Sequence, residues 1–137
     1  MAECSAENAP WLGGRFVALG ALVMALAVIF GAAGDHLVAG GVSAEGLHIY
    51  DIADRFQIYH GLGLLFIGVL IRQYGKRRLL YAAGGLMVLG ILLFCGGLYL
   101  LALTSNVFWA FFAPVGGTAL ILSWLLLALS MWRVSAT

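Results

Sequence analysis

Two histidines and a glutamine are the residues of this chain best suited to binding or proton-transfer chemistry in an apolar setting. His60 and Gln57 lie three residues apart in an otherwise apolar stretch, and His36 follows another such stretch directly after Asp35. Imidazole nitrogens serve as haem axial ligands, metal ligands or proton relays. A neighbouring carboxylate can orient such a ring. We therefore take His36, Gln57, His60 and Asp35 as a candidate polar cluster, either for binding or for structure.

Groups for catalysis are scarce elsewhere in the sequence. Cys4 and Cys95 show no CxxC or zinc-ligand spacing, and neither CxxCH nor HxxxH occurs. The apolar stretches hold no nucleophile–base pair, phosphate-binding loop or carboxylate pair. Cys95 is expected to be a small buried residue. We predict no catalytic residues, no metal site and no cofactor, and therefore no enzymatic activity.

Composition points to a membrane protein. Of the 137 residues, 64% are apolar and 9% carry a charge, whereas a soluble domain has about a quarter of its residues charged. The net charge of +1 provides no basic surface for nucleic acid. The chain is therefore expected to have the lipid bilayer as its main partner and no nucleic-acid partner.

The apolar residues gather in four stretches. Between Arg78 and Arg133 there are 54 residues without Asp, Glu, Lys, Arg or His. That length suits two crossings of a hydrocarbon core of about 30 Å, joined at the polar residues Thr104, Ser105 and Asn106. Helices are expected because an open sheet cannot satisfy its backbone in lipid. The prediction is an all-α membrane protein, one four-helix transmembrane domain over residues 1–137 in an up-down bundle, with spans at about 15–34, 52–72, 79–103 and 107–132.

Basic residues predict the orientation, because short cytoplasmic loops are enriched in Lys and Arg. The loop after the second predicted span contains Arg72, Lys76, Arg77 and Arg78. A cytoplasmic position for this loop places six of the seven basic residues inside and only Arg55 outside. Both termini are then cytoplasmic.

Residues 35–55 form the one long segment predicted outside the membrane. Its first part, LVAGGVSAEG, has the glycine content of a loop. From about Ala44, apolar residues recur at three- and four-residue steps. This spacing predicts an interfacial helix that leads into the second span.

Small residues of several spans fall at a similar depth in the outer half of the predicted bundle. In lipid, helices pack where small residues let backbones approach, and proline beside glycine favours a kink. We expect this layer to serve packing, with a small cavity facing Gln57 and His60 as the alternative. The layer comprises Gly31, Gly34, Gly96, Gly97, Pro114, Gly116 and Gly117. A second packing stripe is expected on the first span, at Gly14, Ala18, Ala21, Ala25 and Ala32.

Four stretches in this order resemble the family called domain of unknown function 423. They read GAAGDHL, FQIYHGLGLL, LLFCGGLYLLAL and PVGGTALILSWLLLA, and the resemblance covers about residues 15–130. It implies a small uncharacterised protein of the bacterial inner membrane. The family's characteristic residues correspond to His36, Gln57, His60, Pro114, Gly116 and Gly117. The chain departs from the family pattern at Asp35, where a small residue is usual, and at Cys95-Gly96-Gly97, which replaces a Ser-Gly-Ser-like stretch.

Three functions follow as hypotheses. The first is a non-catalytic subunit, stabiliser or assembly factor that packs against other integral membrane proteins or against itself. The second is a haem-, metal- or quinone-binding protein that uses His36 and His60. The third is a small permeation or export unit. We favour the first, because short loops and a lipid-dominated surface leave little room for a soluble active site.

Overall fold

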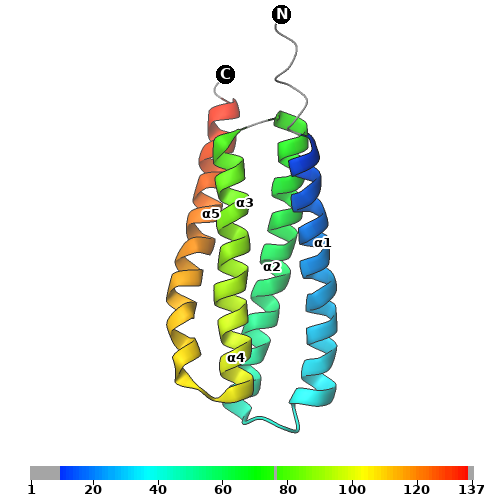
Figure 1. The fold of residues 1–137 in the computed structure, drawn as a ribbon, viewed down its shortest axis with the longest axis vertical. Helices are drawn as coiled ribbons and strands as arrows, with labels where there is room; N and C mark the ends of the chain where they lie inside the picture. Colours follow the sequence, from blue (N-terminus) through cyan, green and yellow to red (C-terminus); the bar gives the residue numbers. More distant parts are fainter. Residues whose placement is uncertain (1–9, 76, 136–137) are drawn as a thin grey trace, which may run out of the picture.

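The computed structural model describes residues 10–75 and 77–135, so Cys4 and Lys76 lie outside the described residues. Within those ranges the chain forms four helical rods that alternate in direction, with the start of α1 and the end of α5 at the same end of the molecule (Figure 1). The all-helical prediction is confirmed. The rods are α1 (Pro10–Ala33) with the π-helical turn η1 (Gly34–Val38); α2 (Ala44–Tyr74); α3 (Arg78–Gly90), the π-helical turn η2 (Ile91–Cys95) and α4 (Gly96–Thr104); and the 3-10 turn η3 (Val107–Phe111) with α5 (Phe112–Ser135).

The segment between α1 and α2 is more helical than the sequence predicts. The first rod continues through Val38, where the N–H of Ala39 donates to the Gly34 carbonyl at 3.0 Å in a π-type bond. Ser43 then caps α2, its hydroxyl accepting the N–H of Gly46 at 3.0 Å. The expected loop LVAGGVSAEG is therefore reduced to residues 39–43. The expected interfacial helix and second span are one continuous helix.

Three of the described rods are long and apolar enough to cross a membrane: Gly13–Val38, Arg78–Thr104 and Val107–Val134. The second rod, α2, is not among them. Its apolar stretch is interrupted by Gln57 and His60 and flanked by charged residues such as Asp54 and Arg72, which lowers its hydropathy. The composition and these rods make the chain an integral membrane protein.

A seam of small residues joins α1 to α2. Gly13, Gly20, Ala27 and Gly34 recur every seven residues and are the buried positions of the first rod among those whose burial is described. A Cβ atom on Gly20 would lie 2.7 Å from the backbone nitrogen of Leu65, far inside contact distance. The two backbones therefore touch, as small residues allow in lipid.

The stripe predicted on the first span does not make this contact. Ala18, Ala21, Ala25 and Ala32 are exposed, and a Cβ on Gly14 would meet nothing within 4 Å. The prediction that this stripe packs within the chain is wrong. Two sets of small residues satisfy helical spacing on α1, and the seven-residue set is the one that faces α2.

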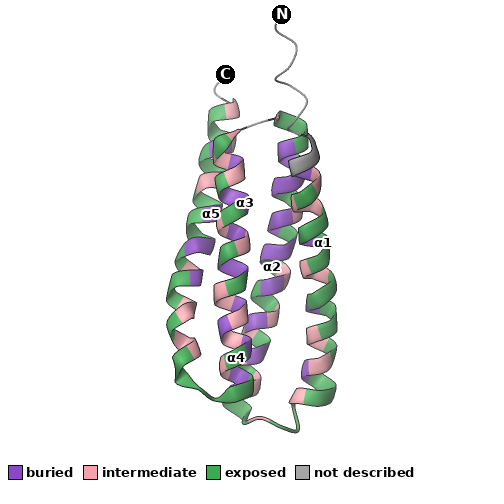
Figure 2. Ribbon diagram, viewed as in Figure 1, coloured by how far each residue is buried: buried purple, intermediate pink, exposed green. Residues whose placement is uncertain are grey.

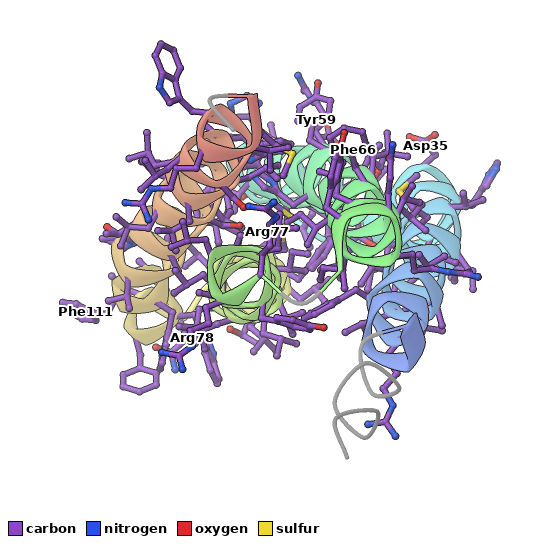
Figure 3. All side chains as sticks on the ribbon, turned by 90° about the horizontal axis from the view of Figure 1, so that it is seen from above. Asp35, Tyr59, Phe66, Arg77, Arg78 and Phe111 are labelled. Atoms are coloured by element: carbon purple, nitrogen blue, oxygen red, sulfur yellow. The ribbon has the colours of Figure 1, made fainter. Side chains whose placement is uncertain are left out.

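The other half of the molecule repeats this close packing. The fourth rod lies along the third, where the Ser123 hydroxyl donates to the Ala83 carbonyl at 2.7 Å and Leu120 sits against Gly90. The central rods, α2 and α3–η2–α4, also pack on each other. The first rod and α5 stand at opposite sides (Figures 1 and 3). Burial is accordingly concentrated on the central rods, and few of the α1 residues whose burial is described are buried (Figure 2).

Candidate functional site

The structure does not bring the predicted polar cluster together. Asp35 and His36 are exposed in the π-helical turn at the end of the first rod (Figure 3). His60 lies deep in α2, at the level of Met24, whose sulfur is close to the neighbouring Gly61. Twelve residues of helix separate Met24 from His36, about 18 Å along the axis. The first rod continues in the same direction through Val38 instead of folding back. His36 therefore does not approach His60, contrary to the prediction that the two would share one polar cluster.

His60 is buried and satisfied by its own helix. Its Nδ1 lies 2.7 Å from the Phe56 carbonyl oxygen, which can only accept, so Nδ1 carries the proton and Nε2 the lone pair. The ring stacks on Phe56 at 5.7 Å and lies 6.1 Å from Trp124 of α5. In the described residues no three His, Cys, Asp or Glu side chains gather as metal ligands. This geometry gives His60 a place in aromatic packing between α2 and α5.

The predicted glycine layer divides into packing positions and open ones. A Cβ on Gly116 would lie 2.4 Å from the Phe94 nitrogen, and one on Gly34 would lie 2.9 Å from the Tyr50 ring. Similarly close neighbours surround Gly31, beside the Asp54 carboxylate, and Gly97, beside the Trp109 carbonyl. Gly117 has only ordinary contacts with the Phe94 ring, and Gly96 faces open space.

Pro114 is exposed in the first turn of α5, directly after the 3-10 turn. A proline there removes no mid-helix bond, because the first N–H groups of a helix have no partner within it. Pro114 therefore marks the start of α5, where the sequence suggested a kink within the span.

Sequence analysis missed an apolar groove between α1 and the third rod, with α2 as its floor. This groove has a volume of about 170 Å³. It shares lining residues with a space of about 140 Å³ beside Leu19 and Val88 and with one of about 90 Å³ beside Tyr50 and Leu103. Gln57 is its buried polar residue, 5% exposed, and donates from Nε2 to the Val23 carbonyl at 3.0 Å. The groove is lined by Val23, Leu26, Phe30, Gln57, Ile91, Leu92, Cys95, Gly96 and Tyr99.

Two tyrosines lie at the end of this groove that is nearer the α1–α2 connection. The Tyr99 hydroxyl donates to Asp54 Oδ1 at 3.2 Å, and the Tyr50 hydroxyl donates to the Phe30 carbonyl at 2.8 Å. The two phenol rings meet edge to face at 4.8 Å. Burial and the nearby Asp54 carboxylate raise the pKa of Tyr50 above its ordinary value. This end of the groove thus holds a cluster of two tyrosines and a carboxylate that are joined by ring contact and hydrogen bonding.

A sequence signal for this groove exists but is weak. Tyr50, Gln57 and Leu64 follow each other at seven-residue spacing, and all three are buried on α2. Such spacing places residues on one helix face. Tyrosines near the ends of membrane spans are common at the membrane interface, so the types and positions of Tyr50 and Tyr99 do not by themselves indicate a groove.

Comparison with known proteins agrees with the resemblance seen in the sequence. Residues 30–117 match the family model described as Protein of unknown function (DUF423). The chain is similar to a UPF0382 membrane protein of Staphylococcus haemolyticus, 37% identical over 118 residues, which cover 86% of this chain and 95% of the relative. It is also similar to the UPF0382 membrane protein YwdK of Bacillus subtilis, 34% identical over 115 residues, 84% of this chain and 94% of the relative. No solved structure matches this chain.

Proposed function

This chain belongs to the DUF423 family of proteins of unknown function, and from that premise we propose that it is a non-catalytic subunit, stabiliser or assembly factor of a larger complex in the bacterial inner membrane. Its partners would be other integral membrane proteins or further copies of itself. Four crossings with both termini in the cytoplasm are part of the proposal. The surface of α1 supports the accessory role, and the distribution of charge supports the orientation.

Charge distribution supports the orientation. Five basic residues lie toward the end of the molecule where α1 begins and α5 ends: Arg15, Arg72, Arg77, Arg78 and Arg133. The described acidic residues lie in the other half, toward the α1–α2 connection: Asp35, Glu45, Asp51 and Asp54. Basic residues favour the cytoplasmic side, so this arrangement supports cytoplasmic termini.

The length and packing of α2 support a fourth crossing. The helix has 31 residues and is about 46 Å long, more than the hydrocarbon core of about 30 Å. Its Gln57 and His60 side chains are buried between the other rods. Polar groups turned inward can cross a bilayer as part of a bundle, although they lower the hydropathy of the helix.

One observation carries the accessory role: α1 exposes small residues where a lipid-facing helix has no need of them. Ala18, Ala21 and Ala25 lie at alternating three- and four-residue steps on its exposed side. Side chains this small let a second helix approach closely. Within the chain the first rod packs mainly on α2, so this face remains available.

The partner can be tested by purification in a mild detergent followed by mass spectrometry. Ala21→Trp is expected to reduce the co-purified partner at least tenfold, because a large ring on this face prevents close approach. The matched control is Leu122→Trp, which places the same ring at a lipid-facing position of α5 that is already 45% exposed. Isolation of the wild type as a monomer without any partner, or full retention of the partner by Ala21→Trp, contradicts the proposal.

The alternative of a haem, metal or quinone between His36 and His60 loses its geometric basis, because these two residues lie at different levels of the molecule.

A further inference from the structure

An aromatic pair bounds the groove between α1 and the third rod on the side where α1 begins. The Phe16 ring lies against Gly84 of α3, since a Cβ on that glycine would be 2.7 Å from the ring. Phe16 also contacts the Tyr81 ring, with 6.5 Å between the ring centroids. The space of about 140 Å³ beside Leu19 and Val88 lies within about two helical turns of this pair. The groove therefore has aromatic rings at this end and apolar walls beyond them.

The hydroxyl of Tyr81 is a buried donor without an acceptor. Its oxygen is covered and makes no hydrogen bond with any residue that the structure describes. A buried hydroxyl without a partner is unfavourable, so a group that supplies an acceptor is stabilised beside it. Side chains of a helix lean toward its N-terminus, so this hydroxyl is directed to the end of α3 that begins at Arg78. Tyr81 as a whole is partly exposed, so a turn of its ring brings the hydroxyl to the groove.

Two exposed arginines continue the walls of the groove at the same end. Arg15 precedes the groove residues Leu19 and Leu26 by four and eleven residues, which places all three on one face of α1. Arg78 precedes Leu92 of the opposite wall by fourteen residues, again about the same face, and its side chain points out of the bundle (Figure 3). No described acidic residue lies at this end of the molecule. The groove therefore begins in a positively charged surface.

The depth of the groove below this surface suits one acyl chain. From Arg78 the third rod rises about 15 Å to Val88 and about 21 Å to Leu92. One leaflet contributes about 15 Å, half of a hydrocarbon core of about 30 Å. The space beside Val88 shares Val23, Ile91 and Leu92 with the space of about 170 Å³, and Leu92 is 66% exposed. A chain in the surrounding leaflet can therefore enter the groove from the side.

We infer that this groove binds one acyl chain of an anionic phospholipid whose phosphate lies at the level of Arg15 and Arg78. The acyl chain runs along Val88 and Leu92, and an ester oxygen accepts the hydrogen bond of the Tyr81 hydroxyl. A negative headgroup is favoured because the charged residues described at this end are all basic. A guanidinium has five N–H donors, so each arginine can bind phosphate in addition to protein groups. The site is independent of the proposed accessory role, because the groove residues of α1 lie on a different face from its exposed alanines.

The test is saturation binding to the full-length protein in detergent, measured by native mass spectrometry. The probe is dioleoylphosphatidylglycerol, and dioleoylphosphatidylcholine provides the same acyl chains with a headgroup of no net charge. Val88→Trp places a large ring in the groove that Val88 lines. Leu89→Trp is the matched control, because the next residue of the same helix is 46% exposed and does not line the groove.

One molecule of phosphatidylglycerol is expected to bind the wild type and Leu89→Trp, and to bind Val88→Trp about tenfold more weakly because the ring occupies its place. The wild type is expected to bind phosphatidylcholine about tenfold more weakly than phosphatidylglycerol. Equal binding of the two lipids by the wild type, unchanged binding by Val88→Trp, or an equal loss in Leu89→Trp overturns the inference.

The arginines are tested by charge removal. The double variant Arg15→Gln, Arg78→Gln is expected to bind the two lipids about equally, because it loses the charge that favours a negative headgroup. Arg133→Gln removes a basic residue from the same end, on α5 and away from the groove, and is expected to keep the preference. A preference kept by the double variant, or lost equally in Arg133→Gln, contradicts the assigned position of the phosphate.

Tyr81→Phe tests the hydroxyl and leaves the ring contact with Phe16 in place. Binding of phosphatidylglycerol is expected to weaken about three- to tenfold. The lipid-free variant is expected to resist unfolding by sodium dodecyl sulfate at least as well as the wild type, because the lost hydroxyl has no described partner. Unchanged affinity, or a destabilised lipid-free variant, overturns the part assigned to Tyr81.

Discussion

Replacing Gly20 by alanine tests the close contact between α1 and α2. The added Cβ would lie 2.7 Å from the Leu65 nitrogen and 2.9 Å from the Gly61 carbonyl oxygen. Both neighbours are backbone atoms of a continuous helix, so they cannot rotate away. Ordinary contact begins at 3.4 Å, and α1 must therefore retreat from α2 by about 0.7 Å.

The cost of this retreat can be worked out. A gap of 0.5–1 Å forfeits about a quarter to a half of the dispersion energy of each contact pair along the seam. Overpacking of this kind costs about 1–3 kcal/mol. Alanine restores about 1 kcal/mol of helix propensity relative to glycine. The expected net loss in the free energy of unfolding is therefore up to about 2 kcal/mol, and relative to a glycine-to-alanine change without a clash it is about 1–3 kcal/mol.

The matched control is Gly14→Ala, on the same helix but with nothing within 4 Å of its added Cβ. This variant is expected to be as stable as the wild type or more stable. The assay is unfolding of the detergent-solubilised protein by sodium dodecyl sulfate, followed by circular dichroism. Equal stability of Gly20→Ala and Gly14→Ala would refute the close contact of α1 with α2 at Gly20.

Three further predictions concern other parts of the molecule. Ser123→Ala removes a buried hydroxyl that donates to a carbonyl of α3, so the free energy of unfolding should fall by about 0.5–1.5 kcal/mol in the same assay. The control is Thr118→Ala, which removes an exposed hydroxyl bonded within its own helix and should change the stability little. His60→Phe is expected to retain the co-purified partner, since His60 serves ring packing here; loss of the partner would give the imidazole a role in binding it. Arg77→Cys is expected to react with a membrane-impermeant maleimide only after the cytoplasmic side of the membrane is made accessible. Gly40→Cys is expected to react in intact cells. The reverse pattern contradicts the proposed topology.

Polar residues between the apolar stretches of the sequence predicted where the third and fourth rods meet. The third rod ends at Thr104 and the fourth begins at Val107, where Asn106 accepts the N–H of Phe108 at 3.0 Å. The start of a helix at about Ala44 was predicted from apolar spacing, and in the structure the Ser43 side chain caps α2 there. Such signals are local, because a cap acts within three residues of itself. The π-helical continuation through Val38 has no such signal, and its absence from the prediction placed His36 in a loop.

The candidate site depended on information that the sequence does not contain. His36 and His60 could be listed as chemically capable residues, but their separation depends on where the first rod ends and how it packs. Cys95 was correctly expected to be buried. Its place in a groove wall depends on the π-helical turn at Ile91–Cys95, which no residue pattern predicted.

The sequence by itself determined the membrane location, the helical class and the family, because hydropathy and composition act through sums over many residues. Only the tertiary structure decided which face of each helix is turned inward. In water, hydropathy distinguishes an inner face from an outer one. In lipid the surroundings are as apolar as the core, so the buried seam of Gly13, Gly20, Ala27 and Gly34 and the exposed stripe of Ala18, Ala21 and Ala25 look alike in the sequence. Only the steric fit of one helix against another separates them.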